Sequence, residues 1–257
     1  MKWSKYEEVN QVIEKLTENH KYIFGDRMVG YYLYGSLVWR DFDIMSSDID
    51  TLCVISSEVT SKDLEELRKM HEEIVSSMPM WNNRIEVHYA PLEGLRNFRT
   101  NTFRMGNISP GEPLHIIDSG MDWIDEWYCV QEYAVTLYGM DKKEVLPSIE
   151  KREFIQTICG YAKSFRERIR TCKGSSYSQA YAILTLCRAL YTLKNEEQVS
   201  KPAAARWASD FLPEYSATIH DALIWRQERD RTSRNPQETY LLAEQFVDDV
   251  LERFFED

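Results

Sequence analysis

Two aspartates stand one residue apart where an apolar stretch begins, in the segment SSDIDTLCVI. Asp48 and Asp50 have the period-two spacing of a β-strand, so we expect both side chains on one face, roughly 7 Å apart along the backbone. Two carboxylates on one face repel each other unless a cation lies between them. Mg²⁺ takes oxygen ligands and often uses one or two protein carboxylates together with phosphate oxygens. The pair therefore predicts a magnesium site that also binds a phosphate group.

A third carboxylate follows on the next predicted strand. Glu86 lies in RIEVHYA between Ile85 and Val87, so its side chain should point away from the apolar face. We expect Asp48, Asp50 and Glu86 to share the metal. Glu86 would act as a ligand, as the base that takes a proton from an attacking hydroxyl, or as both.

A glycine and a serine follow the first predicted strand. Gly35 allows a backbone to approach a ligand closely. The segment SLVWR, which starts at Ser36, could open a helix whose N-terminal amides favour phosphate oxygens. The Ser36 hydroxyl adds a donor, and Ser47 joins Gly35 and Ser36 as a candidate nucleotide contact. Each feature alone is typical of a turn. Their combination with Asp48 and Glu86 favours a site that transfers a nucleotidyl group.

Strands and helices alternate in the first part of the chain, which predicts a compact α/β domain. Apolar runs predict strands at 28–34, 49–55 and 84–90; helical periodicity predicts helices at 5–20 and at 61–78, the second with Ser61 as its N-cap. Residues 91–125 are rich in turn formers and are expected to be irregular. From about residue 126 the pattern becomes helical to the end.

The segment GMDKKEVLPS predicts a domain boundary. We therefore expect an α/β nucleotidyltransferase domain with a small mixed sheet over residues 1–145. An all-helical C-terminal domain over 146–257 would close the cleft for nucleotide and acceptor.

The composition indicates which kinds of partner and which cellular location to expect. The 257 residues carry 31 basic and 42 acidic side chains, a net charge of −11, which makes a nucleic-acid partner unlikely. No run approaches the roughly 18 apolar residues of a membrane span, and the N-terminus is charged and amphipathic. We expect a cytoplasmic protein without a membrane partner.

The spacing of Gly35, Ser36, Asp48, Asp50 and Glu86 resembles the nucleotidyltransferase superfamily of the DNA polymerase β type. The resemblance covers roughly residues 29–90. It implies that the aspartates hold the metals, with Glu86 sharing that duty or serving as the base.

Residues 183–223 are similar to the C-terminal helical domain of the streptomycin/spectinomycin adenylyltransferases. The shared features are L-T-L-x-R, a lysine thirteen residues after that arginine, A-x-x-W-A and L-P. The likeness implies an aminoglycoside O-nucleotidyltransferase. Such an enzyme transfers AMP from ATP to a hydroxyl of a small, amino-bearing acceptor such as an aminoglycoside or aminocyclitol, uses Mg²⁺, and releases pyrophosphate. It also implies that Arg188 and Lys201 contact the ATP phosphates.

One departure concerns the acceptor. Relatives carry acidic residues before L-T-L-x-R that help bind a cationic drug, whereas this chain has Gly174 and Ser178 there and no carboxylate between Thr171 and Leu184. The departure argues against streptomycin. Acidic residues of the middle region are an alternative lining for the acceptor: Glu112, Asp118, Asp122, Asp125 and Glu126. Two other functions stay open, a nucleotidyltransferase acting on a protein or RNA, as in toxin–antitoxin systems, and a non-catalytic nucleotide-binding protein.

Overall fold

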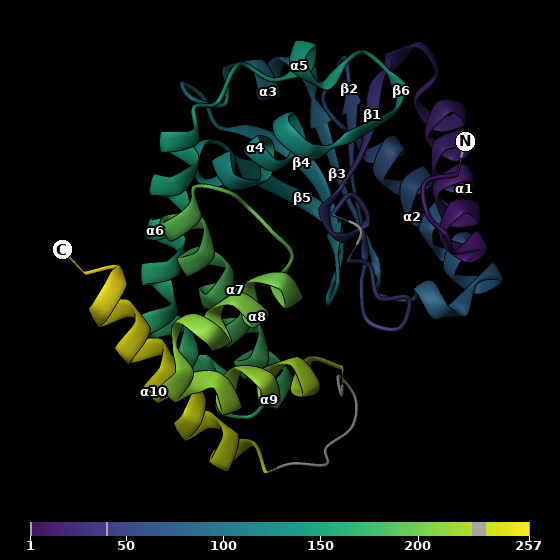
Figure 1. The fold of residues 1–257 in the computed structure, drawn as a ribbon. Coiled ribbons are helices and arrows are strands. Elements are labelled where there is room, and N and C mark those ends of the chain that lie inside the picture. Colours follow the sequence, from purple (N-terminus) through teal and green to yellow (C-terminus); the bar gives the residue numbers. More distant parts are fainter. Residues whose placement is uncertain (1, 40, 228–234, 257) are drawn as a thin grey trace. The chain divides into compact units, whose positions relative to one another are not determined.

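The structure is a computed structural model that describes residues 2–39, 41–227 and 235–256 (Figure 1). The chain divides into two compact units, Met1–Glu150 and Lys151–Asp257. The sequence had placed the boundary between residues 145 and 146. Each unit is described by itself.

The first unit is built on a mixed sheet. In the described residues it has six strands in the order β5-β4-β3-β2-β1-β6. The strands are β1 Met28–Tyr34, β2 Ile49–Ile55, β3 Ile85–Pro91, β4 Phe103–Ser109, β5 Glu112–Ser119 and β6 Val135–Gly139. β2 and β3 are parallel, and every other neighbouring pair is antiparallel. The predicted small mixed sheet is confirmed.

Half of this sheet comes from segments where no strand was expected. β4 and β5 form a hairpin inside residues 91–125, and β6 lies where helix was predicted, so both expectations were wrong. All three strands lie toward the edges of the sheet and are only partly buried. Partial burial leaves polar residues on both faces, which removes the alternation that identifies a strand in a sequence.

Two long helices, α1 Glu7–Phe24 and α2 Ser61–Ser77, cover one face of the sheet (Figure 1). Alternate residues of β1–β3 join them in a hydrophobic core; these include Tyr31, Leu33, Ile49, Cys53, Ile85, Val87 and Tyr89. The shorter helices of this unit are α3 Leu92–Asn97, α4 Ile124–Tyr133 and α5 Lys142–Val145. Because side chains alternate along a strand, the remaining residues of β1–β3 face the opposite side.

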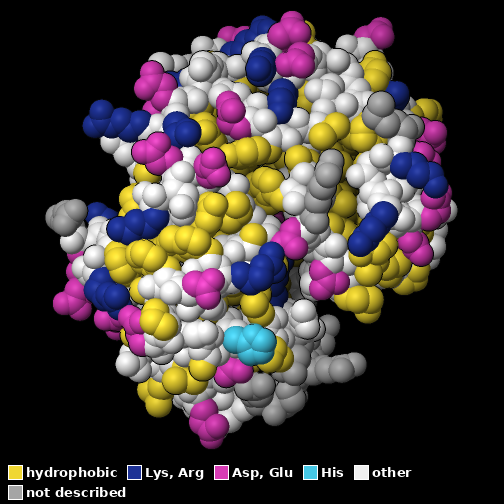
Figure 2. Space-filling view, viewed as in Figure 1, with side chains coloured by type: hydrophobic (Ala, Val, Ile, Leu, Met, Phe, Trp, Pro, Cys, Tyr) yellow, Lys and Arg dark blue, Asp and Glu magenta, His cyan; other side chains and the backbone are white. Residues whose placement is uncertain are grey.

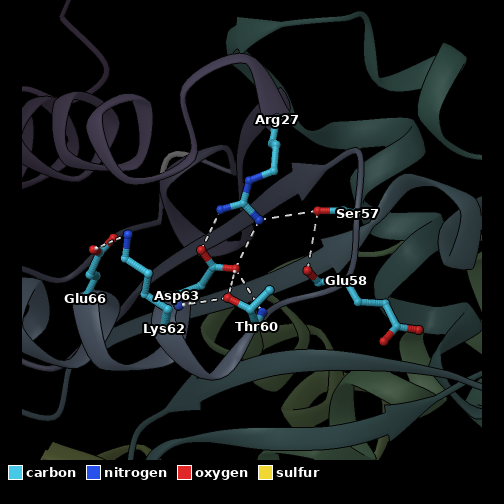
Figure 3. A network of polar contacts seen from close by, with 7 residues as sticks. All are labelled: Arg27, Ser57, Glu58, Thr60, Lys62, Asp63 and Glu66. Atoms are coloured by element: carbon cyan, nitrogen blue, oxygen red, sulfur yellow. Dashed lines mark hydrogen bonds and ion pairs between the residues drawn. The ribbon is translucent and has the colours of Figure 1, made fainter.

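The start of α2 is fixed by an ion pair rather than by the expected cap at Ser61 (Figure 3). Thr60 is the N-cap: its hydroxyl accepts the Asp63 backbone N–H, and the Asp63 carboxylate accepts the Thr60 N–H. Arg27 donates to both oxygens of Asp63, at 3.0 and 2.5 Å. Burial raises the pKa of Asp63, but the hydrogen bonds from Arg27 and Thr60 outweigh it and hold that pKa at about 2.

Replacing Asp63 with alanine should destabilise the first unit. The side chain is only 4% exposed, and its loss removes both the cap and the partner of Arg27. We expect the free energy of unfolding to fall by about 2–3 kcal/mol, measured by urea denaturation at pH 7. Asp26→Ala, at an exposed site beside Arg27, is the control. Equal stability of the two variants would contradict the structural role of the pair.

A tyrosine bridges two buried histidines between the sheet and these helices. The Tyr89 hydroxyl lies 2.9 Å from His20 Nε2 and 2.8 Å from His71 Nε2. Burial holds the pKa of His71 at about 4, and burial together with the charge of His71 holds the pKa of His20 well below its ordinary value. Both rings are therefore neutral in the folded chain at pH 7.

Acid should destabilise the chain through these rings. Because their folded-state pKa values lie below the unfolded value of about 6.5, the unfolded chain binds more protons between pH 6.5 and 4, so stability falls as the pH falls through that window. For His71 alone the loss approaches about 3 kcal/mol. Urea titrations at several pH values should show a shallower pH slope for His71→Gln. The exposed His115→Gln should keep the wild-type slope; the opposite pattern would contradict this origin.

The second unit is helical, as predicted. Its main helices are α6 Lys151–Arg168, α7 Ser176–Asn195, α8 Lys201–Phe211, α9 Ser216–Gln227 and α10 Pro236–Phe254. α7 packs against the other four. Asn235 caps the start of α10, since its side chain accepts the Gln237 N–H. None of the helices in the described ranges has the length and apolar character needed to cross a bilayer. On the face shown in Figure 2, basic and acidic side chains are interspersed.

Candidate active site

Three polar residues form a row across the centre of the sheet, on the face opposite α1 and α2. Tyr34 of β1 is the register partner of Asp50 on β2, and Asp50 is the register partner of Glu86 on β3. Their sequence neighbours on β2 and β3, such as Ile49 and Ile85, point into the core. The strand alternation that builds the core thus places both carboxylates side by side on the other face.

Asp48 joins this pair from the residue before β2. One carboxylate oxygen from each of Asp48, Asp50 and Glu86 lies within 4.8 Å of the other two, and each side chain is half-buried. The sequence predicted this set, and the structure brings it together. A group of carboxylate oxygens alone, with solvent on one side, fits Mg²⁺, which prefers oxygen ligands and keeps room for phosphate and water.

Gly35 is required for the close packing of the turn beside Asp50. Its φ of +72° is a left-handed conformation, and a Cβ atom at this position would lie 1.9 Å from Asp50 Oδ2. No side chain fits that space without displacing the carboxylate. From the sequence we expected Gly35 to let a ligand approach the backbone closely. In the structure the group that approaches Gly35 closely is the Asp50 carboxylate.

The expected helix after Gly35 is a single 3₁₀ turn, Gly35–Leu37, in the described residues; Arg40, at the end of that segment, lies outside them. A turn this short has no helix dipole to bind phosphate, so that part of the prediction was wrong. The Ser36 hydroxyl, however, is buried and makes no hydrogen bond within the described structure. An unsatisfied buried hydroxyl is costly, and this one lies at the turn beside Asp50.

Ser47 holds the loop that carries Asp48. Its hydroxyl accepts the Asp43 backbone N–H at 3.1 Å. Its carbonyl accepts from the Arg84 guanidinium, with Nε at 3.0 Å, and that guanidinium also stacks on Trp81. The sequence predicted Ser47 as a nucleotide contact and missed Arg84, which fixes the residue before the first aspartate.

The charges that act on Tyr34 identify Glu126 as a further acidic residue near the site. The Tyr34 hydroxyl is buried without a hydrogen-bond partner in the described structure. Burial raises the pKa of Tyr34 most, followed by the negative charges of Glu126, Glu86 and Asp50. Glu126 on α4, which was proposed as part of an acceptor lining, is therefore a residue whose charge reaches this row. Three of the others, Glu112, Asp118 and Asp122, are exposed.

His88 lies next to Glu86 and was not predicted. Its Nε2 is 3.5 Å from Glu86 Oε1, and its Nδ1 is 2.8 Å from Asn107 Oδ1. Burial lowers the pKa of His88, but Glu86, Glu126 and Asn107 together raise it above its ordinary value. The alternation of β3 could have flagged His88, two residues after Glu86. The role of Asn107 could not be seen because β4 was not expected.

The second unit gathers positive charge around one tyrosine. Lys201 Nζ, at the start of α8, lies 4.2 Å from the centre of the Tyr181 ring. Burial raises the pKa of Tyr181, and so does Tyr161, while the charges of Arg188 and Arg168 oppose that rise. The predicted residues Arg188 and Lys201 thus share a neighbour. Arg168, stacked on Tyr161 at 5.1 Å, was missed.

Comparison with known proteins adds independent findings. Residues 144–253 match the family model of the aminoglycoside adenylyltransferase C-terminal domain. A spectinomycin 9-adenylyltransferase from Staphylococcus aureus is 29% identical over 225 residues, 82% of each chain. Another from Campylobacter jejuni is 28% identical over 217 residues, 81% of this chain and 80% of the relative.

A solved structure shares the fold. The spectinomycin adenyltransferase AAD(9) from Enterococcus faecialis, determined with ATP and spectinomycin, superposes with a TM-score of 0.70 at 18% identity. The superposition covers 93% of this chain and 98% of that one.

Proposed function

We propose that this chain, an aminoglycoside adenylyltransferase-like enzyme, transfers AMP from ATP to a hydroxyl of an aminocyclitol antibiotic and releases pyrophosphate. Spectinomycin is the first acceptor to test, because the relatives named above are spectinomycin adenylyltransferases. The observation that carries the proposal is the convergence of Asp48, Asp50 and Glu86 within 4.8 Å beside the turn at Gly35.

The three carboxylates would hold Mg²⁺. When bound, the ion neutralises charge on the triphosphate and orients its phosphorus for displacement. The Ser36 hydroxyl, buried and unsatisfied in the described structure, would donate to a phosphate oxygen, and Gly35 and Ser47 would complete this nucleotide-binding edge. Arg188 and Lys201 would contact the ATP phosphates, as the likeness of residues 183–223 to the adenylyltransferases implies.

Glu86 would act on the acceptor. Its half-exposed carboxylate accepts the proton of the attacking hydroxyl as the acceptor oxygen bonds to the α-phosphorus, and the bond from that phosphorus to the pyrophosphate oxygen breaks in line. Glu126 would supply negative charge for an acceptor amine, in place of the carboxylates missing at Gly174 and Ser178. We place the reaction in the cytoplasm, where ATP is supplied.

The test is incubation of the purified chain with ATP, Mg²⁺ and a panel that includes spectinomycin, streptomycin and other amino sugars. We expect pyrophosphate release that requires spectinomycin, together with a drug product heavier by one AMP group in mass spectrometry. Label from ATP that appears on protein or RNA would favour the alternative acceptor classes. ATP binding without pyrophosphate release under any condition would favour a non-catalytic nucleotide-binding protein.

A further inference from the structure

His88 and Asn107 form a buried pair behind Glu86. They are register partners on the antiparallel strands β3 and β4, and His88 follows Glu86 by two residues, so all three side chains share one face. His88 is 2% exposed and Asn107 is 4% exposed. Their connection runs from Asn107 Oδ1 to His88 Nδ1 at 2.8 Å, and from His88 Nε2 to Glu86 Oε1 at 3.5 Å.

The chemistry of these groups fixes the direction of the contact. An ionised carboxylate only accepts hydrogen bonds, so a favourable contact with Glu86 requires a hydrogen on His88 Nε2. The side-chain amide of Asn107 can present either its oxygen or its nitrogen to Nδ1. With Asn107 Oδ1 at Nδ1, a charged imidazole presents its Nε2–H to Glu86. A neutral imidazole presents that hydrogen when the Asn107 amide turns its nitrogen toward Nδ1.

Aromatic rings hold the imidazole in this orientation. The centre of the His88 ring lies 5.0 Å from that of Trp123 and 6.3 Å from that of Trp127, both edge-on, and Tyr34 stacks at 6.4 Å. These three rings and the Asn107 contact at Nδ1 surround the imidazole and favour the orientation in which Nε2 faces Glu86. Such packing preorganises a partner for a functional carboxylate.

We propose that His88, held by Asn107, is a positioning residue that orients the Glu86 carboxylate toward metal and acceptor. The inference rests on the transferase site proposed above. The 3.5 Å separation is longer than an ordinary hydrogen bond and is expected to shorten when substrates bind, as contacts in ligand-free catalytic sites commonly do.

The experiment compares His88→Leu, His88→Gln and His115→Gln in the full chain. Leucine removes the N–H, whereas glutamine restores an N–H donor on a neutral side chain. His115 is the control because it continues the same row on β5, opposite Asn107, with its side chain 43% exposed. The readouts are kcat, the KM for ATP and for spectinomycin, Mn²⁺ affinity by calorimetry, and the melting temperature.

We expect His88→Leu to lower kcat and Mn²⁺ affinity by about 10–100-fold, with both KM values within about twofold. His88→Gln should recover most of the loss, and His115→Gln should match the wild type. Wild-type kcat and Mn²⁺ affinity in His88→Leu would overturn the inference. Equal losses in the leucine and glutamine variants would overturn it too, because they would indicate lost packing instead of a lost donor.

The two proposals fail separately. A wild-type chain that binds Mn²⁺ but transfers no AMP to any acceptor would overturn the proposed function. The Mn²⁺ affinities of the three variants would then still decide whether His88 positions Glu86.

Discussion

Asp50→Asn is expected to lower kcat for AMP transfer by about 10³-fold, because a metal-bound site supplies several kcal/mol of charge stabilisation and each 1.36 kcal/mol is a factor of ten. Asparagine keeps the size of the side chain and removes its charge. Asp50 lies at the centre of the row, as register partner of both Tyr34 and Glu86. The loss should therefore appear with any acceptor, measured as pyrophosphate release.

The same substitution should leave the fold intact. Removing one of three carboxylates that lie within 4.8 Å relieves repulsion in the metal-free chain, so the melting temperature without metal should stay equal or rise. Asp118→Asn, on the exposed side of β5, controls for loss of a surface charge. Undiminished turnover in Asp50→Asn would remove the basis of the proposed function.

Gly35→Ala is expected to lower kcat by about 100-fold although it removes no charged group, because a misplacement of about 1 Å in a catalytic group costs that much. The new methyl group would lie 1.9 Å from Asp50 Oδ2, so the carboxylate or the turn must move. The measurements are kcat and the Mg²⁺ concentration that gives the half-maximal rate. We expect this Mg²⁺ concentration to increase.

Gly111→Ala separates this displacement from backbone strain. Gly111 also has a positive φ, +92°, but a Cβ atom there meets nothing within 4 Å. Both alanine variants should lose about 1 kcal/mol of stability from the left-handed conformation. Gly35→Ala alone should lose activity. Similar kcat values for the two variants would show that the contact with Asp50 does not position the carboxylate.

The carboxylate set was predictable because it depends on local periodicity. Asp48 and Asp50 precede an apolar run, and Glu86 alternates with Ile85 and Val87, so the face of each side chain can be read without the fold. The helical second unit was predictable for a similar reason, since its apolar residues recur at intervals of three and four residues along the sequence.

The support around the carboxylates was not predictable in this way. Asn107 reaches His88 only through the pairing of β4 with β3, and β4 lacks a clear alternation because it is partly exposed. Arg84 anchors the Ser47 carbonyl across a separation of 37 residues. Such contacts depend on tertiary packing, which cannot be predicted from the hydrophobic periodicity of a single segment.

The register between β2 and β3 determines both which side chains enter the hydrophobic core and which carboxylates meet in the site. A slip of one residue would turn Glu86 into the hydrophobic core and expose Ile85 or Val87 to solvent. Misregistered chains would thus be both inactive and unstable, and cellular quality control would remove them. Substitutions that weaken the pairing of β2 with β3 would therefore damage the carboxylate site as well, even at positions whose side chains lie outside it.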